Sequence, residues 1–176
     1  MYTITKNRAG VTVTELIVSI ALVGIITTAL GFEFHGWIAK YRVESQIKEL
    51  YADFMHARVS AMHRNRAFFA DFPSTNSLRI REDTDENADP ANSDSDTILP
   101  NFPKSVQYPV KWAGGTLIFK TTGIVQPSET PLGATLCIFT DNDPDYDCMI
   151  ISQTRINIGK LRDIEGSCNA ANCQHQ

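Results

Sequence analysis

The 176-residue sequence predicts an α+β fold, in which a long N-terminal helix with a transmembrane first half packs on an antiparallel β-sheet head. Three observations predict it. An uncharged apolar run extends from Leu16 to Phe32, and no Pro occurs before residue 73. Apolar residues at helical spacing follow between residues 43 and 61. From residue 67 onward, short apolar or alternating runs are separated by turn residues, which is typical of strands.

The charge of the chain is distributed in blocks. The formal net charge is −4. Residues 1–39 are balanced, residues 40–66 carry a net charge of +3, residues 67–96 carry −6 and residues 97–176 carry −1. The composition excludes a disordered chain, a collagen and a multi-span transporter. The acidic balance makes nucleic acid an unfavoured first choice of partner.

The N-terminal residues have the order of charge and hydropathy of an export signal. Lys6 and Arg8 precede the apolar run, which residues 11–14 extend towards the roughly 20 residues of a membrane-spanning helix. Because basic flanks stay on the cytoplasmic side, we expect the rest of the chain to be exported. A signal peptide cut after Ala29-Leu30-Gly31 and an uncleaved signal anchor are two interpretations. Neither explains Glu15, because a carboxylate in an apolar span is costly unless it is paired.

A third interpretation comes from the residues around Gly10. The segment Gly10-Val11-Thr12-Val13-Thr14-Glu15 resembles the prepilin peptidase site of type IV pilins and their secretion-system relatives, with Val11 in place of the usual Phe. The resemblance implies that residues 1–10 are a leader, that cleavage after Gly10 makes Val11 the N-methylated terminus, and that Glu15 docks the subunit on a neighbour's N-terminus. It also implies that residues 11–39 form a transmembrane and filament-core helix.

The helix is predicted to continue as an amphipathic segment over residues 40–66. Six apolar residues step by 4, 3, 4, 3 and 4 and so share one helical face: Val43, Ile47, Leu50, Phe54, Ala57 and Ala61. They predict one helix from Val11 to about Asn65, roughly 80 Å long at 1.5 Å per residue. His56 and His63 are predicted to be exposed histidines on this helix, because further metal ligands at close spacing are missing.

Three segments resemble the GspH/FimT/FimU group of minor pilins. They are His56–Asn65 at the end of the helix, Gly115–Gln126 and Ile150–Lys160. In the second segment, a strand ending in an aromatic residue is followed by a Gly turn and a short return strand. In the third, Thr154 stands where Gly is usual. The resemblance implies that residues 67–176 form a GspH/FimT-like β-rich head.

The head is predicted to be an antiparallel sheet whose strands are separated by turns at Gly and Pro. The expected strands are Ala67–Phe72, Ser77–Arg81, Ser105–Trp112, Thr116–Lys120, Thr135–Thr140, Met149–Ser152 and Arg155–Leu161. Pro109 makes the third an edge or irregular strand, because Pro donates no ladder hydrogen bond. Residues 82–104 are acidic and contain Pro, which predicts an exposed loop.

The four cysteines are predicted to form disulfides, because the head is expected in an exported compartment. Three connectivities are possible. The local one is favoured, with Cys137–Cys148 joining two adjacent strands and Cys168–Cys173 closing a short loop in the tail.

The loop after residue 140 carries alternating carboxylates: Asp141, Asp143, Asp145 and Asp147. Alternating oxygens can bind calcium, so this loop is a weak calcium candidate. However, Pro144 interrupts it, and neither the Gly nor the later Glu of a calcium loop is present. We therefore predict an acidic turn, with no metal and no cofactor.

No catalytic motif is found in the sequence, so an enzyme is not predicted. The favoured hypothesis is a minor pilin, a structural subunit at the tip or in the priming complex of a type IV pilus. Its expected partners are other pilins, prepilin peptidase and the inner membrane, before it enters an extracellular or periplasmic filament. The alternatives are a GspH-type pseudopilin of a type II secretion system and a FimT-like DNA-uptake pilin. The tail after residue 162 contains no Lys or Arg for DNA backbone contacts.

Overall fold

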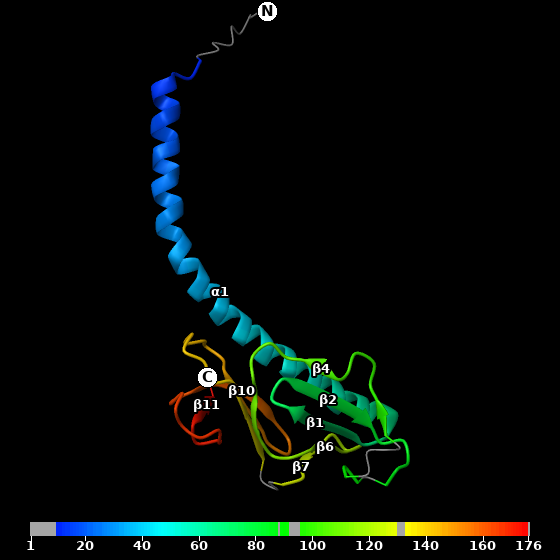
Figure 1. The fold of residues 1–176 in the computed structure, drawn as a ribbon. Helices are drawn as coiled ribbons and strands as arrows, with labels where there is room; N and C mark the ends of the chain where they lie inside the picture. Colours follow the sequence, from blue (N-terminus) through cyan, green and yellow to red (C-terminus); the bar gives the residue numbers. More distant parts are fainter. Residues whose placement is uncertain (1–9, 88, 92–95, 130–132, 176) are drawn as a thin grey trace, which may run out of the picture. The chain divides into compact units, whose positions relative to one another are not determined.

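The computed structural model describes residues 10–87, 89–91, 96–129 and 133–175, with residues 29–35 described as backbone only (Figure 1). Of the predicted leader, Gly10 alone lies within this part of the chain. The chain divides into two compact units, Met1–Ile38 and Ala39–Gln176. One helix, α1 (Val13–Arg64), is followed by strands β1 to β11.

The observed ends of α1 agree with the predicted helix to within two residues. The helix ends at Arg64, after which Asn65 adopts a left-handed conformation with a φ of 53°. The Arg66 N–H then donates to the Ala61 carbonyl at 3.3 Å. This is the hydrogen bond that closes a Schellman cap, and Asn is one of the few residues that tolerate the required backbone angle.

Two antiparallel sheets form the head. The first has the order β3-β2-β1-β6-β7, with β4 also paired to β2. Its strands are β1 (Phe68–Ser74), β2 (Ser77–Glu82), β3 (Thr97–Ile98), β4 (Lys104–Ser105), β6 (Leu117–Phe119) and β7 (Val125–Pro127). The second has the order β11-β10-β9-β8-β5. Its strands are β5 (Lys111–Ala113), β8 (Ala134–Cys137), β9 (Cys148–Ile151), β10 (Ile156–Leu161) and β11 (Cys173–His175).

The second half of α1 supplies one wall of the hydrophobic core. All six residues of the predicted apolar face are 0% exposed, and they share one buried cluster with residues of both sheets. Phe54 is fully buried in it, and the centroid of its ring lies 6.4 Å from that of Phe72, 6.5 Å from that of Trp112 and 6.2 Å from that of Phe119. The spacing of apolar residues therefore predicted the packed face correctly.

The predicted strand Ser105–Trp112 is wrong, because most of its backbone bonds to other parts of the chain. The Gln46 side chain, almost fully buried, donates to the Tyr108 carbonyl at 2.9 Å and accepts from the Tyr108 N–H at 2.8 Å. Val106 and Val110 donate to the turn between β1 and β2. Only the ends of the segment join sheets, as β4 and β5. This connection therefore follows α1 and the β1–β2 turn.

The other six predicted strands are present with shifted ends. The return strand implied by the family resemblance is β7, which pairs with β6. Two strands were not predicted, β3 and β11, and both are only two or three residues long. Each is added to a sheet edge by pairing with a longer strand, which a local sequence pattern does not reveal.

Candidate functional site

The first turn of α1 is closed by a reciprocal pair of hydrogen bonds between Thr12 and Glu15. The Thr12 N–H donates to the Glu15 carboxylate at 3.0 Å, and the Glu15 N–H donates to Thr12 Oγ1 at 3.3 Å. Thr12 Oγ1 also donates to the same carboxylate at 3.0 Å. This is a capping box, which satisfies N–H groups that a helix start leaves without partners. Its sequence signal, Thr-x-x-Glu, overlaps the motif around Gly10, and this cap was not among the predicted features.

The predicted cleavage point lies directly before this cap. Gly10 and Val11 are exposed, and Val11 is 74% accessible to solvent. A Cβ atom added to Gly10 would meet no other atom within 4 Å. Among the described residues, packing therefore gives no reason for Gly at residue 10.

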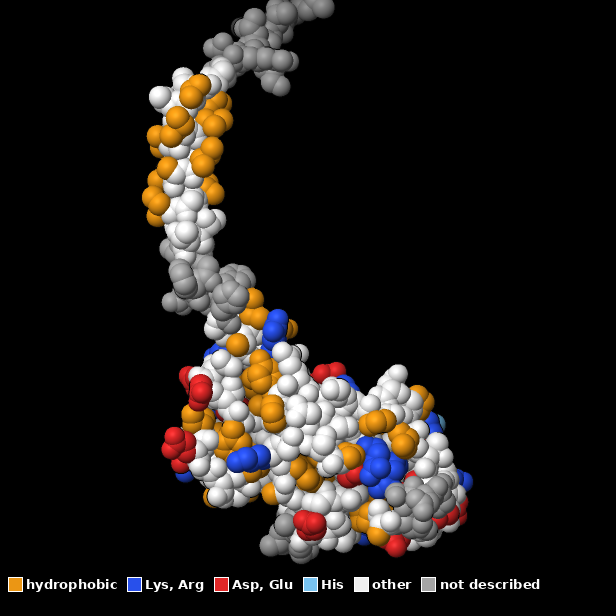
Figure 2. Space-filling view, viewed as in Figure 1, with side chains coloured by type: hydrophobic (Ala, Val, Ile, Leu, Met, Phe, Trp, Pro, Cys, Tyr) orange, Lys and Arg blue, Asp and Glu red, His pale blue; other side chains and the backbone are white. Residues whose placement is uncertain are grey.

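The helix residues after the cap expose an apolar surface. Figure 2 shows apolar side chains along this part of α1. Ten large apolar side chains between residues 11 and 26 are at least 55% exposed: Val11, Val13, Leu16, Ile17, Val18, Ile20, Leu22, Val23, Ile25 and Ile26. Such a contiguous surface marks an interaction site.

The hydroxyl groups within this apolar segment bond to their own helix. Ser19 donates to the Glu15 carbonyl at 2.7 Å, Thr27 to Val23 at 2.9 Å and Thr28 to Ile25 at 2.9 Å. They need no partner outside the helix and so do not oppose burial in apolar surroundings. Among the described residues, no helix reaches the length and mean hydropathy expected of a membrane span.

The head matches a known family. The model of the family described as type II transport protein GspH matches residues 46–154. The match begins in the second half of α1 and ends in the turn between β9 and β10. This is more than half of the chain. The chain belongs to the GspH family. No curated protein and no solved structure matches it.

Membership of the GspH family makes this chain a pseudopilin-like or minor-pilin-like subunit at the level of the family. The family is structural rather than enzymatic. Its filament subunits associate with other pilins or pseudopilins, and its pseudopilins are membrane-anchored before they join a periplasmic filament. The match covers the second half of α1 and the head as far as residue 154, and it does not include residues 10–28. The interpretation of the exposed apolar segment of α1 therefore depends on the geometry described above.

The disulfides of this GspH-family head are present, but the predicted local pairing is wrong. Cys137 is joined to Cys168, and Cys148 to Cys173, with Cα–Cα distances of 5.8 and 5.9 Å. The reason is the path of the tail, which returns as β11 and pairs with β10. Both tail cysteines thereby lie against the sheet that carries Cys137 and Cys148.

The acidic loop between β8 and β9 directs its carboxylates to separate partners. Lys160 donates to Asp143 at 2.6 Å, Lys40 donates to Asp145 at 2.8 Å, and the buried Asp147 accepts from the Leu161 N–H at 2.6 Å. Asp141 is exposed. This arrangement favours the predicted acidic turn over calcium binding, which stays untested.

These contacts shift the pKa values of the loop in opposite directions. The hydrogen bond from Lys160, together with its charge, lowers the pKa of Asp143. The hydrogen bond to Asp145 raises the pKa of Lys40. Burial raises the pKa of Asp147, because the ionised form loses hydration. The loop is therefore held to α1 and β10 by charge.

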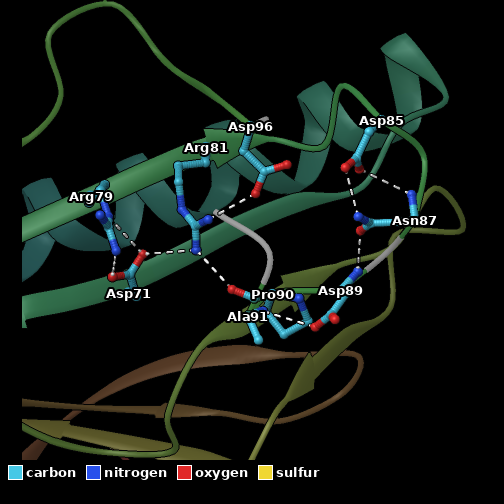
Figure 3. A network of polar contacts seen from close by, with 9 residues as sticks. All are labelled: Asp71, Arg79, Arg81, Asp85, Asn87, Asp89, Pro90, Ala91 and Asp96. Atoms are coloured by element: carbon cyan, nitrogen blue, oxygen red, sulfur yellow. Dashed lines mark hydrogen bonds and ion pairs between the residues drawn. The ribbon is translucent and has the colours of Figure 1, made fainter. Parts of the chain in front are cut away.

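A second polar cluster holds the acidic segment after β2 (Figure 3). Arg81, which is 2% exposed, donates to Asp96 at 2.8 Å and to the Pro90 carbonyl at 3.2 Å, and it lies 3.6 Å from Asp71. Arg79 binds the same Asp71 through two hydrogen bonds. Despite Arg81, burial raises the pKa of Asp96. The predicted exposed loop is thus anchored by a buried arginine that sequence reasoning missed.

Beyond Arg81, the acidic segment is built from hydrogen bonds between neighbours. Asp85 accepts from Asn87, and Asp89 accepts from the Ala91 N–H (Figure 3). Among the described residues, Asp83, Asp85 and Asp96 form the one group of carboxylates close enough together to share an ion. Arg81 already supplies a positive charge beside Asp96, one of the three carboxylates.

More than half of the described cations of α1 and the head are paired with carboxylates. Eight of the described Lys and Arg side chains form such pairs: Lys40, Lys48, Arg64, Arg66, Arg79, Arg81, Lys104 and Lys160. His56 and His63 are exposed on α1, as predicted. Because more than half of the described cations already pair with carboxylates, the surface gives little support to the DNA-uptake alternative.

Proposed function

We propose that this chain is a minor pilin, incorporated at the tip or in the priming complex of a type IV pilus. One observation carries the proposal: a capped helix with an apolar surface exposed along residues 11–26 begins two residues after a predicted peptidase site and continues into a GspH-family head. No catalytic residue is needed for this function. The head is carried by α1, and the exposed half of the helix makes contacts with other subunits.

Assembly begins with removal of residues 1–10 by prepilin peptidase. The exposed Gly10–Val11 bond is accessible to the enzyme, and cleavage leaves the capping box of Thr12 and Glu15 intact. The new ammonium of Val11, carrying a methyl group, then lies one helical turn from Glu15. In the filament, Glu15 of one subunit pairs with the terminal ammonium of a neighbour. Inside apolar surroundings, such a pair is strongly favoured over an unpaired carboxylate.

The exposed apolar side chains require a non-aqueous environment before and after assembly. Fully burying each of the ten is worth about 1.5–3 kcal/mol relative to water, which amounts to roughly 15–30 kcal/mol before the ordering cost. This is more than the stability of a typical domain, about 5–15 kcal/mol. This exposed area supports the proposal that the segment lies in the inner membrane in the precursor and in the filament core after assembly.

A pseudopilin of a type II secretion system is the second candidate. It is favoured by the description of the matching family, type II transport protein GspH. Both candidates use the same helix and the same docking carboxylate, so they differ in the identity of the neighbours and not in the mechanism.

Site-specific crosslinking in cells tests the proposal. A photo-reactive residue replaces Ile20, which is 64% exposed, and a matched control replaces the exposed Gln174 in the tail. We expect crosslinks from residue 20 to the helices of pilus subunits. Crosslinks to secretion-system pseudopilins would support the second candidate. A chain recovered as a free exported monomer, with no crosslinked neighbour at residue 20, would contradict both.

A further inference from the structure

The two disulfides of the head cross each other in sequence, and their first cysteines face each other. Cys137 on β8 and Cys148 on β9 are register partners in the antiparallel pair. The Ile138 N–H donates to the Asp147 carbonyl at 2.8 Å, so the adjacent cysteines occupy a pair without hydrogen bonds between them. Cα atoms in such pairs are about 4.5 Å apart, which is within the range of disulfides. The sheet itself can therefore accommodate a Cys137–Cys148 bond.

Chain statistics favour this competing bond before the head has folded. The native bonds close segments of 31 and 25 residues. Cys137–Cys148 would close 11 residues and Cys168–Cys173 only 5. Because the probability of closure falls with about the 3/2 power of length, the local bonds are favoured by about fivefold and about elevenfold. Cys137 and Cys148 precede the tail cysteines in the chain, so they also leave an exporting channel first.

We propose that the head is first oxidised to the local isomer, Cys137–Cys148 with Cys168–Cys173, and that a thiol-dependent disulfide isomerase of the exporting compartment converts it to the native pairs. The partner is thus an enzyme with a reactive thiolate. Each local disulfide forms by oxidation of two cysteine thiols. The oxidant is a disulfide, which takes up the two electrons and two protons and becomes a dithiol.

The conversion balances without further oxidation. The isomerase thiolate attacks Sγ of Cys148, forming a mixed disulfide and releasing the Cys137 thiolate. The Cys137 thiolate attacks Sγ of Cys168, forming the first native bond and releasing the Cys173 thiolate. The Cys173 thiolate then attacks Sγ of Cys148, forming the second native bond and releasing the isomerase thiolate.

The native isomer prevails because the tail docks on the second sheet. Strand β11 pairs with β10, and the Arg162 N–H donates to the Asn172 carbonyl at 2.9 Å. A Cβ atom at Gly159 would overlap the Gln174 carbonyl, so the two backbones approach closely only because residue 159 is Gly. Docking buries Cys173 beside Leu161. These contacts form only when the tail cysteines reach the sheet, which the native pairs require.

Oxidative refolding of the full-length chain in detergent tests the proposal. The reduced chain is oxidised with ferricyanide, which supplies no thiol, and free thiols are alkylated at intervals before the disulfide peptides are mapped by mass. We expect the Cys137–Cys148 peptide to precede the native peptides, and a purified isomerase in reduced glutathione to accelerate native pairing on the order of tenfold. Native pairs that form first, and equally fast without isomerase, would overturn the proposal.

Two double variants separate rearrangement from general assistance of folding. Cys168→Ser/Cys173→Ser should accumulate the Cys137–Cys148 bond, since no tail cysteine competes for it. Cys148→Ser/Cys173→Ser has a single possible bond, Cys137–Cys168, and should form it at a rate that isomerase does not change. If isomerase accelerates bond formation in Cys148→Ser/Cys173→Ser as strongly as in the wild type, it acts on something other than a non-native disulfide.

Discussion

Glu15 has two physical roles that a simple deletion would confuse. In the single chain, its carboxylate accepts the Thr12 N–H and completes the helix cap. In the proposed filament, the same carboxylate pairs with a neighbour's N-terminal ammonium. Glu15→Ala removes both roles. Glu15→Gln removes the charge alone, because Gln also serves at this position of a capping box. Thr12→Ala is the matched control, since it weakens the cap and leaves the charge.

The magnitudes of the two losses differ enough to be measured. Losing a capping residue costs about 0.5–2 kcal/mol of helix stability. Removing one partner from a buried ion pair costs roughly 3–5 kcal/mol, which is more than a hundredfold in an association constant. We therefore expect Glu15→Gln to fall at least a hundredfold in filament incorporation with unchanged helix content. Thr12→Ala should lose some helix content and assemble within about thirtyfold of the wild type.

The assay compares the variant in sheared filaments with the variant left in membranes, at matched expression. Circular dichroism of the purified chain reports the helix, and the mass of the mature terminus confirms that processing is intact. If Glu15→Gln assembles like the wild type, or if Thr12→Ala is equally defective, the carboxylate acts through the helix cap and the docking role is refuted.

Three further predictions concern the head. Phe54→Ala should lower the free energy of unfolding by about 3–5 kcal/mol, because it opens a cavity in the buried aromatic cluster, whereas Val59→Ala on the exposed face should change it by less than about 0.5 kcal/mol. Arg81→Met should lower the free energy of unfolding by about 3–5 kcal/mol, because it leaves the buried Asp96 carboxylate without its cation. Adding Asp96→Asn should restore most of this stability in urea titrations. If it restores none, Arg81 acts by packing alone. Burial raises the folded-state pKa of Asp147 above its unfolded value, so the ionised carboxylate opposes folding at neutral pH and protonation relieves this as the pH falls. Asp147→Asn should therefore be stabilising at pH 7, with a gain that vanishes towards pH about 4; a variant less stable than wild type at pH 7 would contradict the assignment.

The sequence predicted those features that local periodicity reports. The apolar residues of α1 recur at helical spacing because one side of the helix packs, and residues 43 to 61 of that stripe are all fully buried. The helix was predicted to end near Asn65 and ends at Arg64, where Asn65 adopts the left-handed conformation of a cap. The motif around Gly10 and Glu15 is likewise made of neighbouring residues, but cleavage after Gly10 and docking through Glu15 stay predictions.

Features that depend on residues remote in sequence were not predicted. The segment at Tyr108 reads as a strand, but the side chain of Gln46 takes up its backbone groups. The disulfide pairing depends on where β11 adds to the sheet, and Arg81 is buried because a distant Asp96 returns to it. In each case the local pattern is compatible with two outcomes, and a contact across the fold selects one.

The intact mass and N-terminal sequence of the mature protein show directly whether the chain is processed as a pilin subunit. We expect a chain that begins at Val11, carries one methyl group on its terminal amine and contains no free thiol. A chain that retains Met1, or one that begins after Gly31, would contradict it. The first outcome would mean an uncleaved anchor, and the second a signal peptide whose removal discards Glu15 and the apolar helix surface with it.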